Sequence, residues 1–173
     1  GSMVVQIAKL LGARVITTAG SDEKIEVCRQ YGADHVLNYK TDDIPLRVKE
    51  FAPDGVNVWW ETLREPNFDR TIDLLTERGR MIVMAGRDAR PEFPVGPFYV
   101  KECRLLSFVI FKAPADEQLK AATAINEWLA SGKLQVPIGA TFPIDETAAA
   151  HRLQEENTLG GAGTLQGKIV VEV

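Results

Sequence analysis

The chain has 173 residues, 45% of them hydrophobic and 25% charged, a composition typical of a globular domain and not of a disordered segment. Its 20 Lys and Arg residues against 24 Asp and Glu residues give a net charge of −4, without the basic stripe that nucleic-acid binding requires. No apolar run approaches the roughly 18 residues needed to span a bilayer, and no signal peptide precedes the first strand. We therefore expect a cytoplasmic protein with neither a nucleic-acid nor a membrane partner.

Taken in chain order, the hydrophobic periodicity predicts helices and strands in alternation. Expected helices cover 4–11, 22–31, 41–51, 65–79, 115–132 and 145–157. Expected strands cover 14–19, 34–39, 55–62, 80–86, 104–111 and 168–173. Ser21 and Thr41 are expected to cap the helices that follow them, and Trp59 and Trp60 are expected in the core. The segments 86–101 and 158–167 are expected to be loops.

Strands that are apolar on both faces and alternate with helices indicate βαβ units and a parallel sheet covered on both sides. We predict an α/β, doubly wound Rossmann-type fold that lacks its usual first strand and glycine loop. A dinucleotide-binding domain is expected over 1–142, followed by a C-terminal helix and strand over 143–173. The missing first strand would be central in the sheet. We therefore expect its two neighbours to pair directly, or its place to be filled by the tail strand 168–173 or by a strand from a second chain.

The first helix resembles the one that follows a phosphate-binding loop, so Gly1 is expected to be the last glycine of that loop. Alternatively, Gly1 and Ser2 are a cloning remnant in front of a start at Met3. The glycine-rich tail does not match a nucleotide loop: Ala162 takes the place of the first P-loop glycine and Ile169 that of the Ser or Thr.

In a complete dinucleotide-binding fold, the end of the second strand decides which dinucleotide fits, since an acid there binds a ribose 2′-hydroxyl and repels a 2′-phosphate. In this chain that strand is the one expected over 14–19. No acid stands at the tip itself; Ser21 and Lys24 favour NADP over NAD, whereas Asp22 and Glu23 oppose it unless they point away. Ser21 and Lys24 are equally explained as a helix cap and a solvated lysine.

Neither metal-site spacing nor a catalytic pattern emerges. Cys28 and Cys103 lack a second Cys or a His at metal-ligand spacing, and His35 and His151 are isolated from carboxylate or Cys clusters. We expect no metal, and both cysteines buried as small apolar residues.

The stretches "QIAKLLGARVITTAGSDEK", "YGADHVLNYK", "GRMIVMAG" and "GKIVVEV" resemble the cofactor-binding half and C-terminal tail of zinc-independent quinone oxidoreductases. These are the zeta-crystallin-like branch of the medium-chain dehydrogenase/reductase superfamily. The resemblance covers nearly the whole chain, and "GSDEK…GADHVLNYK" at its spacing is its most specific part. "ETLRE" departs from the usual Asp-x-x-Gly-Gly after the fourth strand of the family.

The resemblance implies a cofactor site spread over several strand ends. It implies that Ser21 and Lys24 face the adenosine 2′-phosphate of NADPH and that Tyr39 lies at the same end. The remaining implied contacts are Thr62 at the adenine, Ala85 and Gly86 at the ribose, Phe108 to Ile110 near the nicotinamide, and Asn157 reaching the nicotinamide end.

The family's reaction is hydride transfer from NADPH to a quinone or enone. Because the GroES-like catalytic domain has no counterpart in the chain, we expect a truncated NADP-dependent oxidoreductase without turnover of its own, and weak or absent NADPH binding. The alternative is a non-catalytic binding or structural module that does not bind NADPH. The apolar strand 104–111 is expected to form a homodimer.

Overall fold

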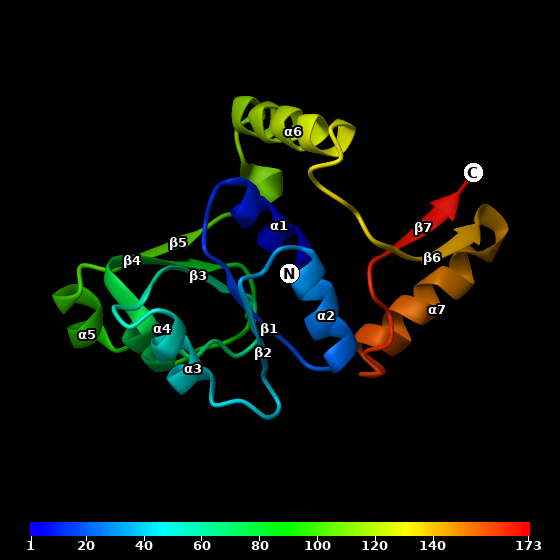
Figure 1. Ribbon diagram of the computed structural model, residues 1–173. Helices are drawn as coiled ribbons and strands as arrows, with labels where there is room; N and C mark the ends of the chain where they lie inside the picture. The colour runs from blue at the N-terminus through cyan, green and yellow to red at the C-terminus, as the bar shows by residue number, and fades with distance from the viewer.

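The computed structural model describes residues 1–173, and strands alternate with helices along it (Figure 1). The strands are β1 (Ile16–Ala19), β2 (His35–Asn38), β3 (Val56–Glu61), β4 (Leu75–Val83), β5 (Arg104–Ser107), β6 (Ile138–Pro143) and β7 (Lys168–Glu172). The helices are α1 (Ser2–Leu10), α2 (Asp22–Gln30), α3 (Ile44–Phe51), α4 (Phe68–Leu74), α5 (Val95–Val100), α6 (Ala115–Ala130) and α7 (Thr147–Thr158). Short 3-10 turns are η1 (Ile110–Lys112) and η2 (Ile144–Glu146). The expected α/β class is confirmed.

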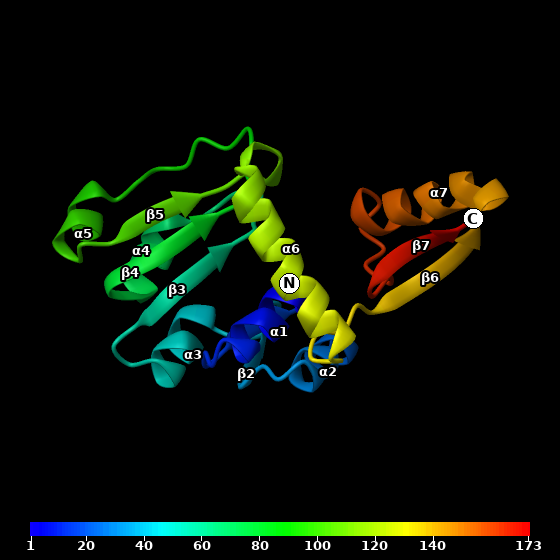
Figure 2. The ribbon, with the colours of Figure 1, turned by 90° about the horizontal axis from the view of Figure 1, so that it is seen from above.

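Every strand pairing is parallel, and the strands form three separate sheets with the orders β1-β2, β3-β4-β5 and β6-β7. Figure 2 shows the second and third of these sheets as two separate groups of strands. The expected pairing of β1 with β3 is therefore wrong, and so is insertion of the tail strand between them. The physical reason for the second error is that β6, α7 and β7 form a βαβ unit whose two strands pair with each other. A strand from a second chain stays a prediction.

Side-chain caps mark the starts of three helices, α2, α3 and α4. Ser21 caps α2 as expected, and its Oγ accepts a hydrogen bond from the Lys24 backbone N–H at 3.4 Å. The cap of α3 is Asp43 and not Thr41, because the Asp43 carboxylate accepts from the Leu46 N–H at 3.1 Å. A carboxylate at this position is also stabilised by the positive end of the helix dipole.

The segment 65–83 departs furthest from expectation. Helix α4 ends at Leu74 instead of Gly79, and β4 begins at Leu75 with a register shift against β3. Lys101 stabilises this early end, since its Nζ donates to the carbonyls of Ile72, Asp73 and Leu75 at 2.9, 2.8 and 2.9 Å. Such capping of helix-end carbonyls by a distant lysine has no local sequence signal. Helix α5 and strand β6 were likewise not expected.

The core consists of two clusters. One lies between the β3–β5 sheet and helices α4 and α5, and its buried members are Ile72, Leu75, Met81 and Cys103. The other contains Leu37, Val48 and Leu74, with Ile16, Ile44, Val56 and Trp59 packed against it. This second cluster, which we call the junction cluster, joins the β1–β2 pair to the β3–β5 sheet through side chains alone.

Two predictions of burial are only partly correct. Cys103 is buried, whereas Cys28 is half-buried. Trp59 packs against both clusters, but Trp60 is 36% exposed and meets Phe108 edge-on at a ring-centroid distance of 6.3 Å. Consecutive side chains of a strand point to opposite faces, so the two tryptophans cannot share one core.

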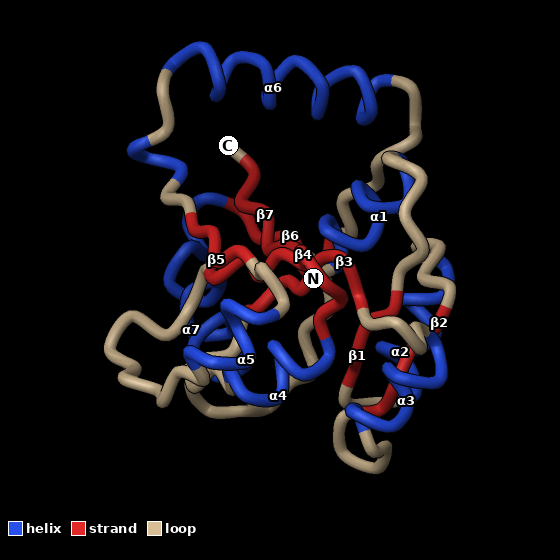
Figure 3. Tube along the Cα trace, turned by 90° about the vertical axis from the view of Figure 1, so that its left-hand side faces the viewer, coloured by secondary structure: helices blue, strands red, loops and turns tan.

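Helix α6 stands apart from the strands that carry the two core clusters (Figures 1 and 3), and the tail lies to one side of them (Figure 2). Helix α6 contains no buried residue, and its apolar side chains Leu119, Ile125 and Leu129 are exposed. The tail, comprising β6, α7 and β7, contributes Ala150 to the buried residues. No helix is both long and apolar enough to cross a bilayer.

We predict that Leu37→Ala, which opens the junction cluster at a 1% exposed side chain, lowers the free energy of unfolding by about 2–5 kcal/mol. Leu119→Ala is the matched control: its side chain is 69% exposed, so the change should stay within about 0.5 kcal/mol. Urea denaturation followed by circular dichroism measures both. Equal, small effects would contradict the role of the cluster.

Candidate functional site

The residues predicted to bind the cofactor lie where the parallel strands end. Ser21 and Tyr39 follow β1 and β2, whereas Thr62, Ala85 and Phe108 follow β3, β4 and β5. In open parallel sheets the carboxyl ends of the strands form the usual ligand-binding edge. The topology therefore collects residues from five strands at the edges where α/β proteins bind ligands, although the strands belong to two sheets.

The first group of side chains surrounds the start of α2. Ser21 occupies the N-cap, and Lys24 lies in the first turn of the helix. Tyr39 is 59% exposed, and its ring lies so close to the Gly20 Cα that a Cβ at Gly20 would overlap the Tyr39 hydroxyl. A side chain at Gly20 would therefore displace the exposed Tyr39 ring from this position. Ser21, Lys24 and Tyr39, which the sequence suggested for one end of the cofactor, are brought together.

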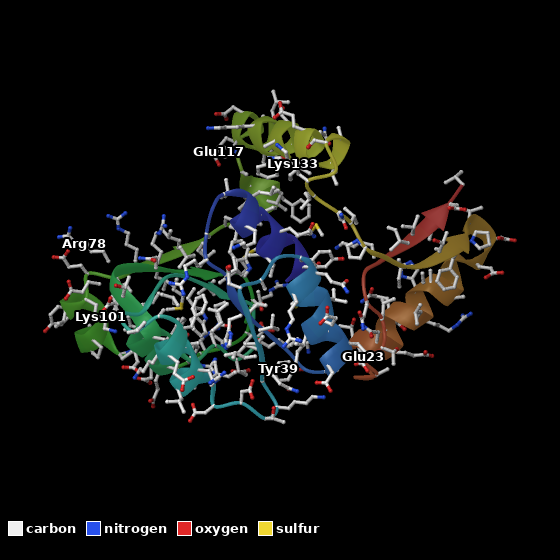
Figure 4. All side chains as sticks on the ribbon, in the orientation of Figure 1. Glu23, Tyr39, Arg78, Lys101, Glu117 and Lys133 are labelled. Atoms are coloured by element: carbon white, nitrogen blue, oxygen red, sulfur yellow. The ribbon has the colours of Figure 1, made fainter.

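Glu23 does not point away from this group. Hydrogen bonds from its own backbone N–H and from the Ser21 hydroxyl, with a smaller effect of the Lys24 charge, hold the pKa of the Glu23 carboxyl below its ordinary value. Glu23 is therefore ionised at neutral pH and places a negative charge beside the hydroxyl that an anionic ligand would use. Figure 4 shows Glu23 at the end of α2 that is nearest to the tail, and Tyr39 on the loop that follows β2.

A second group forms at the ends of β3 and β4. The carboxylate of Glu61, which is 2% exposed, accepts hydrogen bonds from the Leu63 N–H at 2.8 Å and the Trp59 Nε1–H at 3.2 Å. It thereby holds the turn in which "ETLRE" departs from the glycine-containing pattern of the family. Gly86 has a φ of +79°, and a Cβ there would lie 2.9 Å from the Arg64 carbonyl oxygen. The two loops thus touch, and Gly86 permits their close approach.

Thr62 is exposed, Ala85 is half-buried, and Phe108 is 49% exposed beside Trp60. Their assignment to the adenine, the ribose and the nicotinamide stays a prediction. No sequence pattern identified Glu61, although an acidic residue at the end of an apolar strand was the available signal.

Asn157 belongs to the last turn of α7, and its Oδ1 accepts a hydrogen bond from the Leu165 backbone N–H at 2.8 Å. It thereby ties helix α7 to the glycine-rich segment before β7. The same segment contacts Lys24, whose Nζ donates to the Gly163 carbonyl at 2.6 Å. Asn157 is therefore linked to the Ser21 and Lys24 group, whereas the resemblance implied a place toward the nicotinamide.

Gly1 is the N-cap residue of α1, and its carbonyl accepts from the Val5 N–H at 3.1 Å. A Cβ at Gly1 would meet no atom within 4 Å, so no close backbone approach requires a glycine there. The residues around α2 fit one end of NADPH: an ammonium, a hydroxyl and the helix N-terminus suit a phosphate, and the exposed Tyr39 ring suits a flat base. No group of three or more His, Cys, Asp or Glu residues could hold a metal ion.

Comparison with known proteins gives consistent results. Residues 1–127 match the family described as zinc-binding dehydrogenase. The Bacillus subtilis protein named "Putative NADP-dependent oxidoreductase YfmJ" is 38% identical over 144 residues, covering 78% of this chain and 42% of its own. The human quinone oxidoreductase is 27% identical over 172 residues, covering 99% and 50%. A crystal structure of 2-haloacrylate reductase superposes with a TM-score of 0.82 at 27% identity, covering 98% and 52%. The chain thus spans about half the length of the curated relatives it matches.

We predict that Gly86→Ala lowers the free energy of unfolding by about 1–3 kcal/mol, because it combines a left-handed backbone with contact against the Arg64 carbonyl. Gly96→Ala is the control, since a Cβ there would meet nothing within 4 Å and Gly96 lies inside α5. Thermal denaturation of both variants measures the difference. A Gly86→Ala protein as stable as the parent would show that the two loops separate freely.

Proposed function

The chain belongs to the zinc-binding dehydrogenase family, and on that premise we propose that it is the NADPH-binding half of a quinone or enone reductase. The single observation that carries the NADP preference is that the Ser21 hydroxyl, at the N-cap, and the Lys24 side chain, in the first turn, both lie at the start of α2, directly after β1. This is the place where a dinucleotide-binding fold recognises the adenosine ribose. The name of the Bacillus subtilis relative supports the same cofactor.

Binding to this chain is expected to be weak. Lys24 and Ser21 attract a 2′-phosphate, but the ionised Glu23 repels it and holds the Ser21 hydroxyl. The helix N-terminus adds a favourable contribution of about 0.3–1 kcal/mol for an exposed anion. The chain's own residues therefore favour NADPH over NADH by a small margin. Tight binding would need contacts to the pyrophosphate in addition.

The reaction that we propose for the longer protein is reduction of a quinone or enone. The cofactor, when bound, supplies a hydride, which the acceptor takes up together with a proton from water. Residues of this chain orient the cofactor. The site for the quinone or enone is proposed to lie in the half of the longer protein that this chain does not contain. The second candidate function is a non-catalytic module, favoured by the exposure of α6 and the open edges of β1 and β3.

Titration of the purified chain with NADPH and with NADH separates these two candidates. Weak but saturable NADPH binding, tighter than that of NADH, is expected of the cofactor-binding half. Equal affinity for the two nucleotides, or no binding of either, would support the module instead.

We also propose a homodimer formed through β5. All four residues of β5 are exposed, and Leu105 and Leu106 continue into the exposed Phe108, Val109 and Ile110. An exposed apolar edge strand is a template for pairing with a second copy. The edge of β5 is free, because β5 is the last strand in its sheet.

We predict that Glu23→Gln tightens NADPH binding about 2- to 10-fold, since one nearby negative charge is removed and the Ser21 hydroxyl is released. NADH, which has no 2′-phosphate, should bind unchanged. Glu26→Gln, at an exposed residue of the same helix that pairs with Arg29, is the control and should change neither affinity. Weaker NADPH binding in Glu23→Gln would mean that this carboxylate contacts the ribose instead.

The dimer is tested by Leu106→Glu, which puts a charge on the β5 edge and should convert a dimer into a monomer in analytical ultracentrifugation. Leu159→Glu, at a 74% exposed position after α7, is the control and should leave the mass unchanged. A monomeric parent protein, or a dimeric Leu106→Glu variant, would contradict the proposed interface.

A further inference from the structure

One contact connects the glycine-rich segment of the tail to the start of α2. The Lys24 Nζ donates to the Gly163 carbonyl at 2.6 Å, across 139 positions of the sequence. One other residue holds this part of the chain by side-chain hydrogen bonds. The Gln6 amide, in α1, exchanges two bonds of 3.0 and 2.9 Å with the backbone of Gln135, which lies in the loop before β6. The lysine contact is thus an isolated anchor at the proposed adenosine end.

The segment around Gly163 is shaped for this contact. Gly161 and Gly163 adopt φ values of +71° and +63°, a left-handed backbone that residues with side chains rarely adopt. The Asn157 side chain holds the other end of the segment through the Leu165 N–H. A Cβ at Gly163 would lie at an ordinary contact distance of 3.8 Å from the Lys24 Nζ, so the left-handed backbone, and not a lack of space, favours glycine there.

A lysine ammonium has three N–H donors, and the Gly163 carbonyl uses one of them. The other two are available to a phosphate at the Ser21 end of the helix. A long side chain that is already held loses less rotational freedom when it binds a ligand. The contact therefore prepares Lys24 for a 2′-phosphate without consuming its capacity to bind it.

We infer that the tail segment 160–166 determines the cofactor preference, with the Gly163 carbonyl as the positioning group that holds Lys24 over the adenosine 2′-phosphate. This inference rests on the proposed NADPH site and assigns a role to a segment that is remote in sequence. The tail then acts as one wall of the adenosine end. The competing possibility, in which the carbonyl must release Lys24 before a phosphate can bind, predicts an effect of opposite sign.

The test uses the intact chain and two ligands that represent the adenosine end alone: adenosine 2′,5′-bisphosphate and adenosine 5′-monophosphate. Calorimetry gives the two dissociation constants and their ratio, and NADPH and NADH are titrated in parallel. Lys24→Met should weaken the binding of the two ligands with a 2′-phosphate by about 10- to 100-fold. It should leave the affinities for NADH and adenosine 5′-monophosphate within about twofold. Gly163→Val, which cannot keep the left-handed backbone without strain, should weaken them by about 3- to 10-fold.

Gly161→Val is the matched control, because Gly161 shares the positive φ, has open space around its Cα and does not bind Lys24. Retained preference in Gly161→Val with lost preference in Gly163→Val supports the inference. Equal loss in both variants, unchanged preference in Gly163→Val, or tighter binding of the 2′-phosphate ligands by Gly163→Val would each overturn it.

The proposed function is tested by the parent chain in the same experiment. If the parent binds neither 2′-phosphate ligand, the NADPH site and the role of Gly163 both fail. If the parent shows a preference that Lys24→Met removes and Gly163→Val keeps, the site stands and only the role of the tail fails.

Discussion

Leu37, Val48 and Leu74 pack with Trp59 at the junction between the β1–β2 pair and the β3–β5 sheet. In a continuous sheet, backbone hydrogen bonds would fix the relative position of neighbouring strands to within a fraction of an ångström. Here β1 and β3 do not pair, so apolar side chains carry that task. Dispersion and the hydrophobic effect are non-directional and hold two sheets together without defining a register. The spacing between the strand ends, and with it the shape of the ligand-binding edge, depends on this cluster.

The chemistry at the start of α2 follows from charges that oppose each other. Lys24 and the helix N-terminus attract an anion, whereas Glu23 repels it and occupies the Ser21 hydroxyl. Glu23 is exposed and Ser21 and Lys24 are half-buried, so solvent weakens both the attraction and the repulsion. A small change in the position of Lys24 is therefore enough to alter the balance. The tail carbonyl that holds this lysine is the element of the structure best placed to make that change.

Short-range signals were sufficient for much of the fold. Ser21 caps α2, and β1 to β3 lie where β-branched and apolar runs predicted them. Each of these features depends on residues within one or two turns of one another. The predictions failed where residues distant in sequence determine the local structure. Lys101 caps the end of α4 from 26 to 29 positions away, and β7 pairs with β6. Asp43 replaced Thr41 as a cap because both residues suit that role and only the folded backbone selects between them.

The sequence by itself determined the alternation of strands and helices, which depends on periodicity. Its motifs carried the family resemblance, and that resemblance implied the grouping of Ser21, Lys24 and Tyr39. The tertiary structure alone decided that the strands form three sheets, that Glu23 lies beside Ser21, and that the Gly163 carbonyl approaches α2. Such contacts join segments more than 100 residues apart or depend on the rotamer of one side chain, and neither periodicity nor composition encodes either of them.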